Sequence, residues 1–241
     1  MISLPLHHIA LTVGGDLLLA GDDTPDTVVS GTVDTDSRAI GPGDIFVAKP
    51  GETTDGHLFV PAAHQAGAVL ALVERPVDEP ITQIVVRDVV QALADLAREV
   101  VARVRTGGAL KVVGITGSNG KTTTKNLLAR ILEDEGETVA PRASYNSQVG
   151  APLTMLRVTE ETRYLVSEFG ASGPGAIAAL AGLVHPDISV VLMVGMAHAG
   201  GFGGIEGTFR AKSELVHALR PGGVAVLNAD DPRVAQMAPI A

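Results

Sequence analysis

The sequence contains no cysteine and no tryptophan, and it has only two tyrosines and five phenylalanines among 241 residues. The absence of cysteine excludes disulfide bonds, thiolate metal sites and cysteine nucleophiles, and it is compatible with a reducing compartment. The scarcity of aromatic side chains predicts an aliphatic core. It also argues against proteins that stack nucleic-acid bases on aromatic rings.

Positive charge is scarce as well: 18 Lys and Arg residues against 27 Asp and Glu residues give a net charge of −9. Proteins that bind DNA or RNA through its phosphates usually carry a basic excess, so no nucleic-acid partner is expected. The first basic residue is Arg38, so no export signal is predicted. Glycines interrupt the long uncharged stretches 169–186 and 188–205, which favours buried strands and loops over a membrane span. We therefore expect a cytoplasmic monomer.

Hydrophobic periodicity divides the chain into two parts. Short strands and helices alternate up to Gly107-Gly108, as in a small α/β domain, and strand–loop–helix units repeat after it. The repeat predicts an α/β fold in which a small N-terminal α/β domain (1–106) precedes a doubly wound parallel-sheet domain (107–241). The expected strands are 28–35, 45–48, 69–73, 84–87, 112–115, 164–169, 188–194 and 224–227, and the expected helices are 5–13, 58–65, 89–104, 122–132, 176–183 and 209–219.

The strongest chemical signal is a glycine-rich segment between a predicted strand and a predicted helix. It reads Gly-Ile-Thr-Gly-Ser-Asn-Gly-Lys-Thr-Thr over residues 114–123. Backbone N–H groups of such a loop cradle phosphates, Lys121 would contact the outer phosphates, and the Thr122 hydroxyl would ligate Mg²⁺. The position five before Gly120 is Ile115 instead of the usual glycine, so an ordinary glycine-rich turn is the alternative.

Three further residues are candidates for chemistry in the second part. Glu168 ends a predicted strand, where it could hold Mg²⁺ or simply be solvated. His198 follows another strand in a glycine-rich loop, where it could bind metal or phosphate or make a structural hydrogen bond. Lys212 falls within the apolar arc of the predicted helix 209–219. It therefore needs a partner or a chemical task there, unless it extends to solvent from the helix start.

Three polar clusters are ambiguous on their residues alone. They are residues 34–38 (Asp-Thr-Asp-Ser-Arg), 55–57 (Asp-Gly-His) and 228–232 (Asn-Ala-Asp-Asp-Pro). Asp, Asn and Ser commonly hydrogen-bond the local backbone in turns, which is the simplest interpretation of the first two. The third follows the last predicted strand and could be either a turn or a loop that faces a ligand.

Together, these segments resemble the Mur ligase family of ATP-dependent amide-forming enzymes. Residues 116–123 are similar to the family's TGTNGKT loop, with Ser118 where threonine is usual, and that loop also accounts for the displaced first glycine. Residues 36–48, 55–57 and 146–154, and Ala197-His198 followed by Glu206, resemble the branch that joins D-alanyl-D-alanine to UDP-N-acetylmuramoyl-tripeptide in peptidoglycan synthesis. The resemblance covers nearly the whole chain.

The resemblance implies a role for each matching position. The ATP-binding residues would be Thr116, Gly117, Ser118, Asn119, Gly120, Lys121, Thr122 and Thr123. Thr122 and Glu168 would ligate Mg²⁺, His198 would serve a second metal position, and Lys212 would be the family's carbamylated lysine. Lys121, Lys212 and His198 would be the catalytic residues. The UDP-substrate would contact Ser37, Arg38, Asp55, Gly56, His57, Asn146 and Ser172.

The resemblance also implies a reaction and its partners. ATP would convert the carboxylate of the UDP-linked peptide to an acyl phosphate, which the amine of D-alanyl-D-alanine would attack. Family members have three domains, so this chain is expected to end inside the central one and to be inactive alone. Two alternatives stay open: a sister ligase that adds another amino acid, and a non-catalytic substrate-binding fragment. A GTPase-like switch is disfavoured because the sequence has no Asn-Lys-x-Asp motif.

Overall fold

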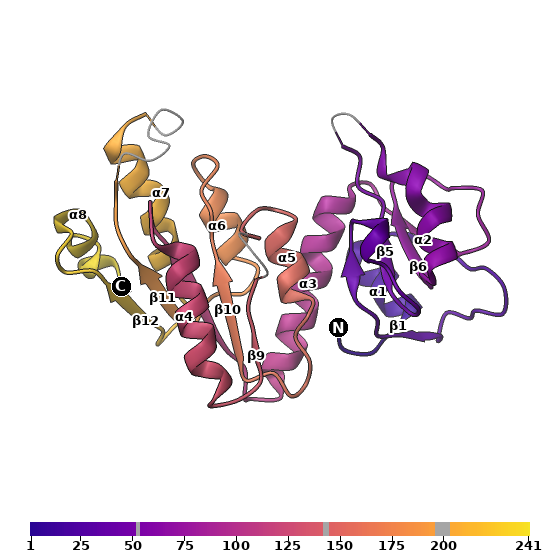
Figure 1. Cartoon of the computed structure of the whole chain (residues 1–241), viewed down its shortest axis with the longest axis horizontal. Helices are drawn as coiled ribbons and strands as arrows, with labels where there is room; N and C mark the ends of the chain where they lie inside the picture. Colours follow the sequence, from indigo (N-terminus) through magenta and orange to yellow (C-terminus); the bar gives the residue numbers. More distant parts are fainter. Residues whose placement is uncertain (52–53, 142–144, 196–202) are drawn as a thin grey trace. The chain divides into compact units, whose positions relative to one another are not determined.

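A computed structural model describes residues 1–51, 54–141, 145–195 and 203–241 (Figure 1). Internal contacts divide the chain into two compact units, Met1–Val100 (unit 1) and Val101–Ala241 (unit 2). This division falls within helix α3 (Val89–Thr106), whereas the predicted domain boundary follows that helix. Within the described ranges, no helix is both long and apolar enough to cross a membrane.

Unit 1 is built on a mostly parallel sheet with the strand order β2-β7-β6-β5-β4. Its strands are β2 (Asp16–Leu18), β4 (Val33–Asp34), β5 (Ile45–Val47), β6 (Leu70–Val73) and β7 (Thr82–Val85). Only β2 runs antiparallel to its neighbour in this sheet, and β5 and β6 are buried along their whole length. Such uniformly apolar strands are typical of a parallel sheet that is covered on both faces.

The predicted strand 28–35 is wrong as a single element. It forms β3 (Val28–Val29), which pairs with β1 (Leu4–Pro5), and β4, which joins the main sheet. Between them the chain passes from one sheet to the other at Gly31, where an added Cβ would lie 2.0 Å from the carbonyl oxygen of Gly43. Only glycine allows so close an approach between two backbones.

The helices of unit 1 end where the sequence predicts. Helix α1 (Leu6–Val13) is followed by Gly14, and α2 (Val60–Ala66) is followed by Gly67. Both glycines adopt positive φ, at 62° and 107° respectively. Such left-handed glycines are common terminators because they have no Cβ to clash.

Unit 2 contains an entirely parallel sheet with the strand order β12-β11-β8-β10-β9. Its strands are β8 (Lys111–Thr116), β9 (Thr138–Val139), β10 (Tyr164–Glu168), β11 (Ile188–Val191) and β12 (Val224–Leu227). The helices of unit 2 are α4 (Lys121–Glu133), α5 (Gly150–Met155), α6 (Ala176–Ala181), α7 (Ile205–His217) and α8 (Pro232–Ala235).

Helices cover both faces of this sheet. On one face, Leu128 and Leu132 of α4 pack against Val113 and Ile115 of β8. On the other face, the space above Gly114 is filled by side chains that include Leu215 of α7. The predicted doubly wound α/β fold is therefore confirmed.

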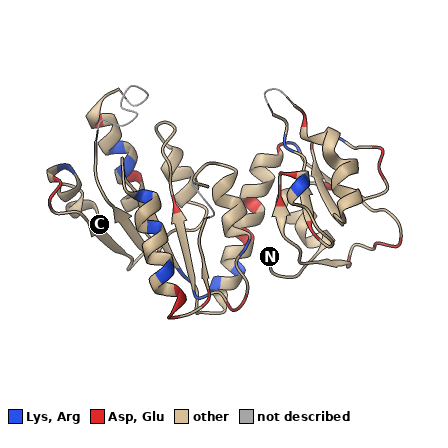
Figure 2. Ribbon diagram, in the orientation of Figure 1, with Lys and Arg blue, Asp and Glu red and all other residues tan. Residues whose placement is uncertain are grey.

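One detail of α4 differs from the sequence pattern. Leu127, Leu128, Ile131 and Leu132 lie on one side of the predicted helix, but Leu127 and Ile131 are each 63% exposed. Lys125 and Ala129 are buried instead. The buried face of α4 is thus rotated toward Lys125. Basic residues occur along both α4 and α7 (Figure 2).

Candidate active site

The glycine-rich loop occupies the crevice position of unit 2. Strand β8 ends at Thr116 and α4 begins at Lys121, so residues 117–120 connect them. Strand β8 lies between β10 and β11, and the chain reaches these two neighbours by connections that lead to opposite sides of β8. In open α/β sheets, ligands bind at the carboxyl ends of strands at this kind of switch point.

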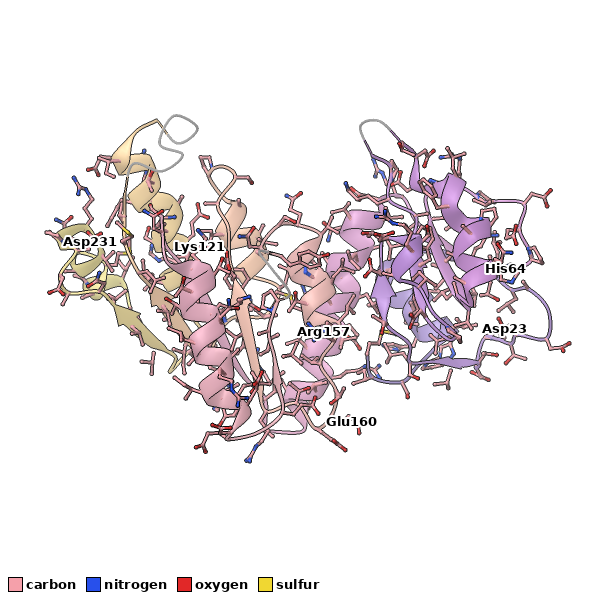
Figure 3. All side chains as sticks on the ribbon, viewed as in Figure 1. Asp23, His64, Lys121, Arg157, Glu160 and Asp231 are labelled. Carbon is pink, nitrogen blue, oxygen red and sulfur yellow. The ribbon has the colours of Figure 1, made fainter. Side chains whose placement is uncertain are left out.

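The loop has the compact backbone of a phosphate cradle. Gly120 adopts a φ of 84°, and an added Cβ at Gly117 would lie 2.9 Å from Cβ of Leu192. Lys121, labelled in Figure 3, begins α4. It folds back over the loop, and its Nζ donates to the carbonyl oxygen of Gly117 at 2.9 Å. A phosphate oxygen can replace that carbonyl as the acceptor.

Ser118 fastens the loop to the segment that follows β11. Its backbone N–H donates to the carbonyl of Met193 at 3.0 Å. Its hydroxyl accepts from the Gly195 N–H at 2.8 Å and donates to the Gly195 carbonyl at 3.2 Å. The serine that replaces the family's usual threonine therefore uses its hydroxyl for positioning within the protein.

The structure brings Glu168, Thr122 and Asn146 together. Glu168 ends β10 and is 1% exposed. Its carboxylate accepts from the Thr122 hydroxyl at 3.0 Å and from Asn146 Nδ2 at 2.7 Å. Each carboxylate oxygen is thus oriented by a separate neutral donor.

This oxygen-rich group fits Mg²⁺. Magnesium in nucleotide sites is commonly held by one or two protein oxygens together with phosphates and water. Across the residues that the structure describes, no cluster of three or more His, Cys, Asp or Glu side chains could hold a metal alone. The Thr122 and Glu168 oxygens therefore suit a cation that arrives with a nucleotide.

Lys212 lies on the buried face of α7, as its position in the apolar arc predicts, and it is 5% exposed. Burial, followed by the nearby charge of Lys121, lowers the pKa of its amine to about 8. Lys212 therefore loses its proton more readily than an exposed lysine does. The second lysine thus supplies a candidate nucleophilic amine close to the phosphate loop.

In the part of the chain that the structure describes, no contact bears on the predicted roles of two further residues, His198 and Ser172. His198 falls in 196–202, outside the described residues. Ser172 lies exposed in the connection between β10 and α6. Their proposed roles remain predictions.

The motifs of unit 1 gather at one edge of its sheet. Residues 36–38 follow β4, residues 55–57 follow β5, and Glu74 and Arg75 follow β6. Arg38 has an 88% exposed side chain and pairs with Asp36 at 2.7 Å, which lowers the pKa of Asp36 to about 2. The Asp36 carboxylate also caps the short 3-10 helix Ser37–Ala39. At this edge Ser37 is half-buried and Arg38 is exposed, and their contact with a UDP-substrate stays a prediction.

His57 is enclosed at the same edge, at 3% exposure. Its Nε2 accepts the Glu74 backbone N–H at 2.8 Å, so Nδ1 carries the hydrogen and donates to Asp55 at 2.6 Å. The other Asp55 oxygen accepts from Arg75 at 2.5 Å. Both ring nitrogens of His57 are therefore engaged within the protein, while Asp55 and Arg75 reach the surface.

Sequence reasoning missed Arg75 and Lys125. Arg75 joins Asp55 only through the tertiary fold, so no local pattern reveals it. Lys125 is 2% exposed, and its Nζ donates to the carbonyl of Pro141 at 2.8 Å. A helical wheel for α4 places Lys125 beside Ala129, at the border of the apolar face that the leucines and Ile131 predict, so the pattern gave no signal that Lys125 is buried.

Comparison with known proteins agrees with this geometry. The family profile described as "Mur ligase family, catalytic domain" matches residues 31–106, and "Mur ligase middle domain" matches residues 115–240. The UDP-N-acetylmuramoyl-tripeptide–D-alanyl-D-alanine ligase of Mycobacterium leprae is 44% identical over 99% of this chain and 50% of its own length. The chain spans about half the length of the curated relatives it matches.

Solved structures show the same likeness. A crystal structure of MurF from Acinetobacter baumannii has a TM-score of 0.87 at 36% identity, covering 99% of this chain and 51% of that one. The MurF ligase from Thermotoga maritima in complex with ADP has a TM-score of 0.77 at 34% identity, covering 87% of this chain and 48% of that one. Because the middle-domain profile alone covers more than half of the residues, this chain belongs to the Mur ligase family.

Proposed function

We propose that the protein acts in the ATP-dependent formation of an amide between D-alanyl-D-alanine and UDP-N-acetylmuramoyl-tripeptide, a step of peptidoglycan precursor synthesis. The observation that carries the proposal is the group at the carboxyl ends of β8 and β10, where the phosphate loop meets the Thr122–Glu168–Asn146 contacts. The name of the M. leprae relative supports the choice of substrates.

The chain's own residues divide the work on the nucleotide. Backbone N–H groups of the loop and the N-terminus of α4 would bind the phosphates, and Lys121 would exchange the Gly117 carbonyl for a phosphate oxygen. Asn146 would keep the Glu168 carboxylate oriented. Thr122 and Glu168 would hold a Mg²⁺ ion and His198 would serve a second metal position, and the bound metal would supply charge neutralisation on the phosphoryl group.

Lys212 would contribute as a carbamate. Its neutral amine can add to CO₂: an N–C bond forms, the nitrogen loses a proton, and the product carries a negative charge. The modification would replace a buried cation beside Lys121 with an anion, so it would convert repulsion between the two side chains into attraction. An anionic oxygen in this position is a suitable metal ligand.

Activation of the substrate carboxylate explains the need for ATP. A carboxylate is a poor acyl donor because its oxygen leaves poorly. Phosphorylation forms a bond from a carboxylate oxygen to the γ-phosphorus of ATP and breaks the bond from that phosphorus to ADP, which leaves. The D-alanyl-D-alanine amine then attacks the acyl carbon, the C–N bond forms, the amine loses a proton, and the C–O bond breaks to release phosphate. In unit 1, Ser37, Arg38 and the 55–57 segment would hold the UDP end of the substrate.

Calorimetric titration tests the two units separately. We expect the chain to bind UDP-N-acetylmuramoyl-tripeptide saturably, and to bind Mg-ATP in a second titration. Binding of Mg-ATP without the UDP-tripeptide would favour a sister ligase with another substrate. We also infer that these 241 residues bind without turnover, and ADP release that depends on both other substrates would contradict that inference.

A further inference from the structure

The turn formed by residues 228–232 has no part in the proposed chemistry. It connects β12 to α8, and Asp231 caps that helix. Asp231 Oδ1 accepts from the backbone N–H groups of Arg233 at 2.9 Å and Val234 at 3.3 Å. Capping by an aspartate followed by proline is an ordinary helix start, and it requires only one of the two carboxylate oxygens.

The second oxygen of Asp231 contacts a different part of the molecule. Oδ2 accepts the backbone N–H of Val194 at 2.8 Å. Asn228 acts beside it: its Nδ2 donates to the carbonyl of Leu192 at 2.9 Å, while its Oδ1 accepts the Asp230 N–H at 3.0 Å. The two side chains therefore hold the backbone of residues 192–194, the segment that follows β11.

Packing strengthens this attachment. Val194 is buried in a cluster with Val234 of α8 and Met237 after it, so the segment also makes apolar contacts with the helix that Asp231 caps. The side of the segment that faces away from the turn contacts the phosphate loop. Leu192 N–H donates to the Thr116 carbonyl at 3.0 Å, and the Met193 carbonyl accepts from Ser118 N–H at 3.0 Å.

We propose that Asn228 and Asp231 are positioning residues for the phosphate loop. Through residues 192–195, they fix the backbone of Gly117 and Ser118 in the arrangement that a nucleotide's phosphates require. Neither residue needs to touch the nucleotide, because a loop held in its binding geometry loses less conformational freedom when the ligand arrives. This inference rests on the proposed nucleotide binding by the loop.

Two substitutions separate this role from ordinary turn structure. Asp231→Asn keeps an acceptor for the α8 cap but puts an amide donor where Oδ2 accepts from Val194. Asn228→Asp keeps the acceptor for Asp230 N–H but removes the donor to Leu192. Asp230→Asn is the matched control, since Asp230 is an exposed neighbour and the charge change equals that of Asp231→Asn.

The experiment has two readouts on the full 241-residue chain. Hydrogen exchange of the nucleotide-free protein reports how firmly residues 114–120 are held, and calorimetry with Mg-ADP reports affinity. We expect Asp231→Asn and Asn228→Asp each to accelerate exchange in the loop and to weaken Mg-ADP binding by about tenfold, as expected for loss of a hydrogen bond worth about 1.4 kcal/mol. Asp230→Asn should match the wild type in both measurements.

The two readouts keep the outcomes distinct. If both variants exchange and bind as Asp230→Asn does, the positioning role is wrong. The positioning role is also wrong if Asp231→Asn and Asn228→Asp lower the melting temperature but the hydrogen-exchange rate of residues 114–120 increases no more than that of the rest of unit 2. If the wild type does not bind Mg-ADP, the proposed function fails, and faster loop exchange in both variants would still support the attachment of the loop to the turn.

Discussion

Both units place polar residues after parallel strands, but they use them differently. In unit 1, His57 engages both ring nitrogens and Asp55 engages both carboxylate oxygens with partners in the protein. In unit 2, Lys121 donates to a carbonyl of its own loop, and Lys212 is buried near the positive charge of Lys121. The first arrangement is a completed hydrogen-bonded cluster, whereas the second places two lysines near each other, and bound anions would reduce the repulsion between them. The motif residues of the two units therefore differ in their partners: those of unit 1 are paired within the protein, and those of unit 2 keep an excess of positive charge.

The largest expected effect is on nucleotide binding in unit 2. Lys121→Ala should weaken Mg-ATP binding by about 100-fold, because a charge-assisted bond to phosphate contributes about 3 kcal/mol. Arg130→Ala is the control, since it removes an equal charge from an exposed position on the same helix. Calorimetry measures both. Wild-type affinity in Lys121→Ala would refute the assignment of the phosphate loop.

The next effect tests the close backbone approach at Gly56, which lies between Asp55 and His57 of the hydrogen-bonded cluster in unit 1. Gly56→Ala should lower the free energy of unfolding by about 3 kcal/mol, because the new Cβ would lie 2.4 Å from the Lys49 carbonyl oxygen. Gly41→Ala, whose Cβ would lie 3.6 Å from an Asp44 oxygen, should change it by less than about 0.5 kcal/mol. Urea unfolding followed by circular dichroism compares them. Equal stabilities would contradict the close approach at Gly56.

A smaller effect distinguishes two histidines of unit 1. His57→Ala should lower the free energy of unfolding by about 2 kcal/mol, because it leaves the Glu74 N–H without its acceptor. His64→Ala breaks a partly exposed contact with Glu79 and should cost less than about 1 kcal/mol. Thermal unfolding ranks the two variants. The reverse order would indicate that His57 is held for binding and contributes little to stability.

Acid should weaken the same cluster. The Arg75 guanidinium, followed by hydrogen bonds from His57, holds the pKa of Asp55 well below its usual value near 3.8. The folded form therefore binds this proton less readily than the unfolded chain, so the stabilisation is complete above about pH 4 and disappears as pH falls further. Asp55→Asn should flatten the acid side of a melting-temperature profile, and the exposed Asp22→Asn should leave it unchanged.

The last effect concerns Lys212 and has the opposite sign. Because the folded pKa is about 8 against a usual 10.5, the unfolded chain binds the proton more tightly. Stability of unit 2 should therefore rise with pH between about 8 and 10.5 in CO₂-free buffer, and Lys212→Met should remove that slope. Added bicarbonate should stabilise the wild type at pH 8 and leave Lys212→Met unaffected. A wild type that ignores bicarbonate would contradict carbamate formation.

Local pattern was sufficient for much of unit 2. Strand β12 has the predicted bounds, because Val224–Leu227 is an apolar run that follows a glycine turn. The periodicity of α7 likewise predicts the buried position of Lys212, which the fold confirms. Both features depend on neighbouring residues alone, which is why the sequence could predict them.

Other elements depend on contacts between distant residues. Helix α5 (Gly150–Met155) is buried on every side, so it lacks the amphipathic spacing that reveals most helices. The pairing of Arg75 with Asp55 requires β5 and β6 to lie side by side. The attachment of Asp231 to Val194 likewise requires the ends of β11 and β12 to be adjacent. No spacing within a single segment encodes such contacts.

The strand orders of the two sheets have a consequence for synthesis of the chain. In unit 1, β4, β5, β6 and β7 pair in the order in which they are made, so most of that sheet can form by local additions. In unit 2, β8 does not pair with the next strand in the chain, β9, which lies at the edge of the sheet. It pairs with the later strands β10 and β11, so these contacts join distant parts of the chain. Since distant contacts slow folding, we expect unit 1 to fold first on the ribosome. The phosphate loop would become competent only once β11 has been made.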